Sequence, residues 1–281
     1  MRVLKFCDSH WSYSPTDVEP TQLSAYEALA LISLVRCGGW IDSCCIGPLQ
    51  SSSIKLTPLE PQFKYGQFGR LISAGLASPN SSSPEDAFYE QHGQIIGWEP
   101  EMVCWSLRVP DPVKFVRTLE NIIDSNAWPE PWQGECSGIW QELAVAECWE
   151  FCEYSLAQRN LPVPGTTAAL SLFNNLLRDF SVSQCYQLIW ASASDATDYR
   201  ARKGVSPQHA ANYLVGACQR RADRYRAEGW AIKGFQRNFS LGRSQVSHVL
   251  HDVFLQHGEA GFFSCPSAPF AGTSSKHPLS K

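Results

Sequence analysis

Apolar residues recur every three or four positions along much of this chain, which is the spacing of one face of an α-helix. The pattern is most consistent in the second half of the chain. In the first half, shorter apolar runs alternate with serine- and proline-rich breaks. The predicted helices cover residues 21–37, 63–76, 113–124, 138–158, 181–203, 207–228 and 244–256, with one more around residues 170–177.

Strands are predicted at residues 95–98 and 102–109, which are rich in β-branched and aromatic side chains. These two strands would form a hairpin after the helix at 63–76. A helix followed by a hairpin is the outline of a winged helix, so residues 60–109 resemble that element as well as a generic small α+β region. Either arrangement gives an α+β N-terminal region.

The tryptophan- and proline-rich run at residues 128–132 interrupts this pattern and marks a domain boundary. We therefore expect a mainly α protein with an α+β domain over residues 1–130 and a helical domain over residues 133–262. Residues 264–281 are rich in serine, proline and lysine, and this composition predicts a flexible tail.

Two helices of the predicted helical domain have the clearest ends. Ser181 and Gln184 form the capping-box pattern that starts a helix, and Gly204 suits the left-handed residue that ends one. Ser206, followed by proline, starts the next helix, which ends at Gly229. Because the connection between the two helices is short, they are predicted to form an antiparallel hairpin.

Composition places the chain among globular proteins. Its 281 residues are 44% hydrophobic and 12% aromatic, enough for a substantial core. No apolar run approaches the roughly 20 residues of a membrane-spanning helix, and the N-terminus lacks the pattern of an export signal. The 11 cysteines are scattered along the chain, which favours reduced thiols in the cytoplasm. No membrane partner is expected.

Charge is distributed unevenly. Residues 1–198 hold 11 Lys/Arg against 23 Asp/Glu, a net −12, whereas residues 199–243 hold 10 against 2, a net +8. An excess of this size attracts phosphate backbones or an acidic protein surface. The alternative explanation is pairing with the acidic N-terminal half, within one chain or between the subunits of a homo-oligomer.

The helical hairpin divides this segment into two basic patches, because each helical residue advances about 1.5 Å. The larger patch, near the end of the second helix and in the loop after it, comprises Arg220, Arg221, Arg224, Arg226, Lys233, Arg237 and Arg243. The turn patch comprises Arg200, Arg202, Lys203 and His209. We expect charge reversal at Arg220 and Arg224 to impair function more than reversal at Arg202 and Lys203.

Aromatic residues interleave with these cations, as a surface that stacks single-stranded bases requires, although the same rings can fill a core. Tyr225 shares a helical face with Leu214 and Cys218 and is expected to be buried. Arg221 falls on that face too. A largely buried arginine needs a carboxylate or a phosphate, so Arg221 is expected either in a structural ion pair or as an anchor for a ligand.

One arginine–histidine pair suggests catalysis as an alternative. The segment Arg243-Ser244-Gln245-Val246-Ser247-His248 resembles the Arg-x4-6-His motif of HEPN ribonucleases, helical proteins that dimerise and cut RNA without a metal. The resemblance implies that Arg243 would stabilise the phosphate and that His248 would handle a proton or the leaving group. A similar spacing from Arg202 to His209 crosses the hairpin turn. Chance supplies about one such spacing in a chain of this composition.

Pairs of potential metal ligands occur at Cys148 and Cys152 and at His248 and His251. Neither has the second pair that a zinc site needs. Core cysteines and surface histidines are therefore expected, and we predict no metal and no cofactor.

Glu147, Glu150 and Glu153 follow the three-residue spacing of a solvated helix face. Phosphate-binding loops, dinucleotide-binding motifs and nucleophile elbows do not occur in the sequence. The sequence therefore predicts a non-catalytic binding protein that uses its basic C-terminal helical surface to engage DNA, RNA or a partner protein. A metal-independent ribonuclease using Arg243 and His248 is the alternative.

Overall fold

The computed structural model describes residues 2–11, 15–125 and 127–267. It shows a mainly α protein with small sheets in its N-terminal region, as the sequence predicts. The helices of that region are α1 (Arg2–His10), η1 (Pro20–Gln22), α2 (Ala25–Gly38), η2 (Leu49–Ser51), α3 (Pro61–Ser73), η3 (Glu85–Ala87) and α4 (Pro112–Asp124). The later ones are α5 (Trp132–Ala157), α6 (Thr166–Leu176), α7 (Val182–Lys203), α8 (Pro207–Glu228), α9 (Gln245–His248), the π-helix η4 (Val249–Phe254) and α10 (Ala260–Phe263).

The strand pairing differs from the predicted one. The strands are β1 (Cys45–Ile46), β2 (Ala77–Pro79), β3 (Phe88–Gln91), β4 (Gln94–Trp98) and β5 (Trp105–Leu107). The two predicted strands, β4 and β5, do not pair with each other: β4 pairs with β3, and β5 lies between β1 and β2 in an antiparallel sheet. A local turn decides this, because His92 and Gly93 both have positive φ, 52° and 78°, as a tight hairpin requires.

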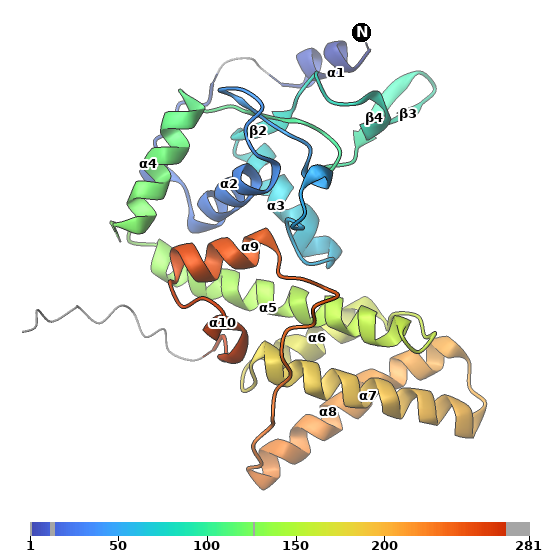
Figure 1. Cartoon of the computed structure of the whole chain (residues 1–281). Helices are drawn as coiled ribbons and strands as arrows, with labels where there is room; N and C mark the ends of the chain where they lie inside the picture. Colours follow the sequence, from blue (N-terminus) through green and yellow to red (C-terminus); the bar gives the residue numbers. More distant parts are fainter. Residues whose placement is uncertain (1, 12–14, 126, 268–281) are drawn as a thin grey trace, which may run out of the picture.

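A helix followed by a hairpin is present within residues 60–109, since β3 and β4 come after α3 (Figure 1). Both cations of α3 are paired with glutamates. Lys64 Nζ lies 2.9 Å from Glu101, and Arg70 Nη2 lies 3.0 Å from Glu142. This helix therefore offers no unpaired cation to a phosphate backbone, and the resemblance to a winged helix stays a prediction.

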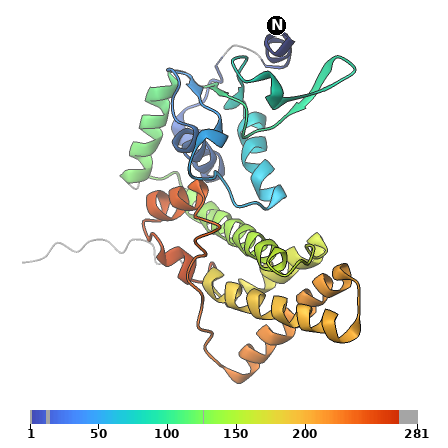
Figure 2. The ribbon, with the colours of Figure 1, turned by 45° about the vertical axis from the view of Figure 1, so that its right-hand side comes forward.

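Helix α5 runs through the centre of the molecule, with the N-terminal region on one side and α6, α7 and α8 on the other (Figures 1 and 2). Buried residues occur all round it, because other elements cover it on both sides. Glu147 and Glu150 are only 3% and 4% exposed. The prediction of a solvated face is therefore wrong for these two carboxylates, and Glu153 alone of the three is exposed.

Each buried carboxylate of α5 is paired with a cation from a distant segment. Glu147 accepts a hydrogen bond from Arg237 at 2.8 Å, and Glu150 accepts one from Lys55 at 2.6 Å. Periodicity within α5 cannot reveal these partners, because they lie about 90 residues away in the sequence. Buried charge of this kind is stable only when it is paired.

The predicted helical hairpin is formed by α7 and α8, and the residues predicted to start and end these helices do so. Ser181 and Gln184 form a reciprocal capping box at the start of α7. Gly204 follows α7 with φ 66°, and Gly229 follows α8 with φ 64°, both in the left-handed region. Ser206 caps the start of α8 through its side chain.

The chain returns to the N-terminal region after α8. The backbone N–H groups of Gln245 and Val246 donate to the carbonyls of Lys55 and Leu56 at 2.8 and 2.9 Å. Beyond them, α9 and η4 pack against α2. The helix predicted at residues 244–256 is thus present in two parts, α9 and a π-helix.

Trp132, at the predicted domain boundary, is a junction of the core. It is fully buried, and its indole N–H donates to the Leu23 carbonyl at 2.7 Å. Its ring centroid lies 5.6 Å from that of Phe254. One hydrophobic core therefore extends through both predicted domains. Of the tail predicted at residues 264–281, residues 268–281 lie outside the described part of the chain.

None of the described helices combines the length and the apolar character that crossing a membrane requires.

Candidate binding surface on the helical hairpin

Several cations of the predicted larger patch are neutralised within the molecule. Arg221 Nη2 lies 2.6 Å from Asp195, which confirms a structural ion pair for this arginine. Arg226 lies 2.8 Å from Asp179 and 3.0 Å from Asp223. These two side chains hold α8 against its neighbours and are poorly placed to bind an external anion.

Two more cations of that patch are held after α8. Arg237 contacts buried Glu147 at 2.8 Å and lies 3.6 Å from Glu259. Arg243 contacts Asp252 at 2.9 Å and Glu259 at 3.1 Å. Arg237 thus pairs with the acidic part of the chain before residue 199, as one alternative left open by the sequence expects. Arg243 instead pairs with carboxylates that follow it in the sequence.

The remaining Lys and Arg side chains of the two predicted patches have no carboxylate within 4.0 Å among the described residues. They are Arg200, Arg202, Lys203, Arg220, Arg224 and Lys233. Arg200 is half-buried and the others are exposed. These side chains belong to the hairpin and to the segment directly after it, so this is where the unpaired cations of residues 199–243 lie.

Arg220 lies toward the turn rather than with the end of α8. Its guanidinium covers the ring of Tyr213 at 5.3 Å from the centroid. The side chain passes close to Gly216, where an added Cβ would lie 3.1 Å from Nη1. Tyr213 in turn stacks on Tyr199 of α7, with centroids 4.3 Å apart and planes at 7°, and His209 stacks on Tyr199 at 5.9 Å. Ring contacts through Tyr213 and Tyr199 therefore link Arg220 to His209 of the turn patch.

Arg224 makes a second contact of this kind. Its guanidinium lies 5.1 Å from the ring centroid of Trp230, which is 50% exposed. Tyr225, expected in the core, is half-buried and packs edge-on against Trp230 at 6.0 Å. Tyr213, Arg220 and Arg224 share one face of α8, because they are seven and four residues apart. That face extends about 22 Å from Tyr213 to the end of α8.

A cation thus lies over an aromatic ring at two places on the hairpin and the segment after it. We call this set the hairpin surface: Tyr199, Arg200, Arg202, Lys203, Tyr213, Arg220, Arg224 and Trp230. The sequence predicts its charge, but not which cations stay unpaired or that two of them lie on rings.

The arginine and histidine of the HEPN-like pair are held by internal contacts. Arg243 donates four hydrogen bonds: Nε donates to the Ser247 hydroxyl, Nη1 to Asp252, and Nη2 to the Ser247 carbonyl and to Asp252. Its Nη1 also lies 3.1 Å from Glu259. His248 Nδ1 lies 3.2 Å from the same Asp252. The Arg243 guanidinium is thus held between two carboxylates of its own chain. This geometry gives the ribonuclease hypothesis no support, and it stays a prediction.

A second histidine pair lies beside this network. Nδ1 of His251 and Nε2 of His257 are 2.8 Å apart, and both rings pack against Trp140. Burial, together with His257, Arg243 and Arg237, holds the pKa of His251 well below its ordinary value. Burial and Arg243 also lower the pKa of His257. Both rings are therefore neutral in the folded protein at pH 7.

We expect stability to fall as the pH is lowered below about 6.5, because unfolded histidines take up protons there while the folded pair does not. The loss should approach about 1.4 kcal/mol per pH unit for each histidine until the lowered folded pKa is reached. Urea unfolding at pH 7.5 and 5.5 measures this loss of stability. Replacing His251 by leucine should make the difference in unfolding free energy between the two pH values smaller. The control His209→Gln, at an exposed position, should leave that difference unchanged. Equal differences in the two variants would contradict the assignment of the pH dependence to the His251–His257 pair.

The described residues contain no group of three or more His, Cys, Asp or Glu side chains that could hold a metal ion. Cys148 and Cys152 are buried, as predicted, and burial raises the pKa of both thiols. His251 is 2% exposed, so the prediction of a surface histidine is wrong for this residue. His251 is buried because it belongs to η4, which packs on the core.

Comparison of the chain with protein-family models, with curated proteins and with solved structures gives no match. The inference of function rests on the chemistry of the residues themselves.

Proposed function

We propose that the protein is a non-catalytic binding protein whose hairpin surface engages nucleic acid in the cytoplasm, with single strands preferred. The observation that carries this proposal is the set of cations without carboxylate partners on α7 and α8, two of which lie over aromatic rings. Unpaired guanidinium groups bind phosphates. Trp230, which is half exposed beside Arg224, offers a ring on which a base of a single strand can stack.

An acidic partner protein would also satisfy these cations. The aromatic contacts favour nucleic acid, because Arg220 with Tyr213 and Arg224 with Trp230 place charge and ring side by side twice along one helix face. Phosphates and bases alternate along a strand in a comparable way. Trp230 supports this in particular, since half of its surface is exposed beside a cation.

Binding of a fluorescein-labelled single-stranded oligonucleotide of about 12 nucleotides, followed by anisotropy, tests the proposal. The logarithm of the affinity should fall linearly with the logarithm of the salt concentration, with a slope of up to about −4 if six cations each meet one phosphate. A duplex of equal length should bind more weakly. Absence of binding at low salt would reject the proposal, and a stoichiometric protein partner in the native complex would then favour the partner hypothesis. RNA cleavage that is abolished by His248→Ala would contradict the non-catalytic role.

We expect the double charge reversal Arg220→Glu and Arg224→Glu to lower the affinity by at least about ten-fold, because it removes both cations that lie on rings. Reversal at Arg202 and Lys203 should cost less. The matched control is Lys114→Glu with Arg117→Glu, which makes the same charge change at exposed positions of α4. If the α4 control weakens binding as much as the α8 reversal, the interaction follows net charge alone and this assignment is wrong.

A further inference from the structure

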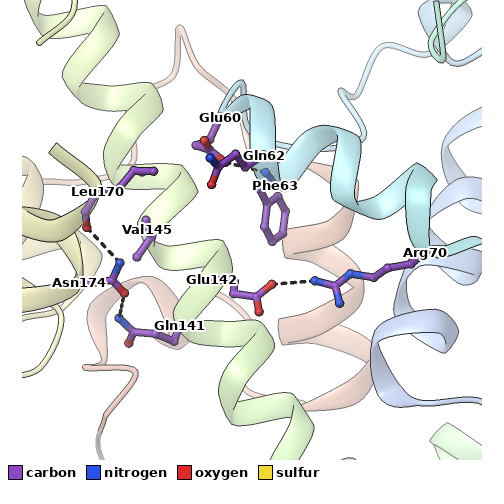
Figure 3. Close-up of a pocket in the computed structure, with 9 residues that line it drawn as sticks. All are labelled: Glu60, Gln62, Phe63, Arg70, Gln141, Glu142, Val145, Leu170 and Asn174. Carbon is purple, nitrogen blue, oxygen red and sulfur yellow. Dashed lines mark hydrogen bonds and ion pairs between the residues drawn. The ribbon is translucent and has the colours of Figure 1, made fainter. Parts of the chain in front are cut away.

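The pocket between α3, α5 and α6, of about 230 Å³, is lined in part by polar side chains that contact one another (Figure 3). Arg70 donates to Glu142 at 3.0 Å, and Gln141 donates to Asn174 at 3.4 Å. These four side chains are engaged by the protein itself. The segment after α8 differs from the pocket, because it presents a cation and two rings to solvent.

Residues 230–239 form no helix or strand, and contacts with α7 and α5 hold them in place. The Phe235 N–H donates to the Ser183 carbonyl at 2.9 Å, and the Ser183 hydroxyl donates to the Phe235 carbonyl at 2.6 Å. Gly234 approaches Ser183 so closely that an added Cβ would overlap the hydroxyl. Arg237 is bound to a buried carboxylate of α5. The path of the segment is therefore fixed.

Exposed side chains recur at every third residue of this segment, at Trp230, Lys233, Gln236 and Phe239. Of the six positions between them, only Ala231 is also exposed. Trp230 is 50% exposed, and Phe239 is 95% exposed. Lys233 has no carboxylate within 4.0 Å among the described residues. The segment thus presents a ring at each end and an unpaired cation between them.

Phe239 projects from a turn whose backbone is fixed. The Ser240 N–H donates to the Asn238 side chain at 2.8 Å, and Arg237 and Arg243, on either side of the turn, are bound to carboxylates. A single exposed apolar residue needs no functional explanation. A ring on a fixed backbone, however, loses less conformational entropy when it binds a partner. Phe239 therefore suits a contact surface better than a residue of a loose loop would.

We propose that a single strand bound by the hairpin surface continues past Trp230 along residues 230–239, where Lys233 meets a phosphate and Phe239 stacks on a base. This inference rests on the proposed function. Trp230 supports the continuity, because it belongs to the hairpin surface and also begins the segment. Single-strand sites combine cations for the backbone with aromatic rings for the bases, and the segment presents both.

The direction of the segment favours a single strand over a duplex. The chain turns after α8 at Gly229, which has φ 64°, and runs back past α7 and α5 toward α9 (Figures 1 and 2). A nucleic acid that follows α8 and then the segment must turn with them. A duplex resists such a turn, because its persistence length is about 50 nm, whereas a single strand lacks this stiffness.

The lengths of the two surfaces predict how many nucleotides they hold. The hairpin face from Tyr213 to the end of α8 is about 22 Å long, and nine residues of extended chain add at most about 30 Å. At about 3.4 Å per nucleotide, the spacing within one stacked strand, the first surface holds about six nucleotides and the second at most about nine. Oligonucleotides of about 6 and about 18 nucleotides therefore separate the two surfaces.

Fluorescence anisotropy on the full chain, with labelled oligo(dT) of these two lengths at one low salt concentration, tests the proposal. Phe239→Ala should weaken binding of the longer strand by about five-fold or more, the loss expected for one stacked base, and should leave binding of the shorter strand within about two-fold. Phe239→Trp should bind the longer strand at least as tightly as the parent chain. The matched control is Tyr65→Ala, which removes a 52% exposed ring from α3 and should change neither affinity.

The outcomes separate this inference from the proposed function. If both strands bind and Phe239→Ala leaves the longer one unchanged, or weakens both equally, the binding proposal survives and the extension along the segment is wrong. An equal loss in Tyr65→Ala would also overturn the extension. If neither strand binds, the proposed function fails and the extension fails with it. Loss of a stoichiometric protein partner in Phe239→Ala, without any binding of oligo(dT), would assign the exposed ring to a protein interface instead.

Discussion

Replacing Glu147 by alanine should lower the free energy of unfolding by about 3–5 kcal/mol, because it leaves the Arg237 guanidinium buried without its main partner. The two side chains are 4% and 15% exposed, and their closest atoms are 2.8 Å apart. Burial by itself lowers the pKa of Arg237, and Glu147 more than offsets this, so that the pKa lies above its ordinary value. Urea unfolding at pH 7 measures the loss.

Two further variants separate the charge from the packing. Glu153→Ala, at an exposed position of the same helix, should change stability by no more than about 0.5 kcal/mol. The double variant Glu147→Leu with Arg237→Met should recover most of the loss, since an apolar pair of similar volume needs no charge compensation. A double variant as unstable as Glu147→Ala would show that shape rather than charge dominates this contact.

Replacing Trp132 by alanine should cost about 3–5 kcal/mol, the range for a fully buried aromatic side chain. The indole is 0% exposed, donates to Leu23 and packs on Phe254 and Trp128. The loss should appear as one cooperative transition at lower denaturant, because the residue belongs to a core shared by the N-terminal region and the later helices. Circular dichroism and tryptophan fluorescence should report the same midpoint.

Trp230 provides the matched control. It is half exposed, so Trp230→Ala should change stability by less than about 1 kcal/mol while weakening oligonucleotide binding. Two separate transitions in Trp132→Ala, one for each predicted domain, would contradict the shared core. Equal losses at the two tryptophans would mean that burial does not govern the effect.

The features that the sequence predicts well are local ones. The hairpin follows from signals within a few residues of each helix end, such as the capping box at Ser181 and the glycine at 204, and the structure places both as expected. A capping interaction involves neighbours in the chain, so its chemistry is visible in the sequence. The turn at His92 and Gly93 is local too, but without an asparagine or aspartate before the glycine it is a weaker signal.

The features that the sequence does not predict depend on distant contacts. Glu147 and Arg237 are 90 residues apart, so the helical period of α5 does not indicate that these two charges pair. The same limit applies to the basic segment. Its net charge is a property of the sequence, but the distinction between paired Arg221 and unpaired Arg220 depends on where Asp195 lies after folding. For this reason only part of the predicted patch remains as a candidate surface.

The packing of α9 and η4 on α2 has a consequence for biosynthesis. The ribosome makes α2 well before residues 245–254, which cover part of α2 and donate to the Lys55 and Leu56 carbonyls. Until then an apolar part of α2 lacks its cover, and such surfaces promote aggregation of nascent chains. This part of the native core is therefore completed only after residues 245–254 have left the ribosome.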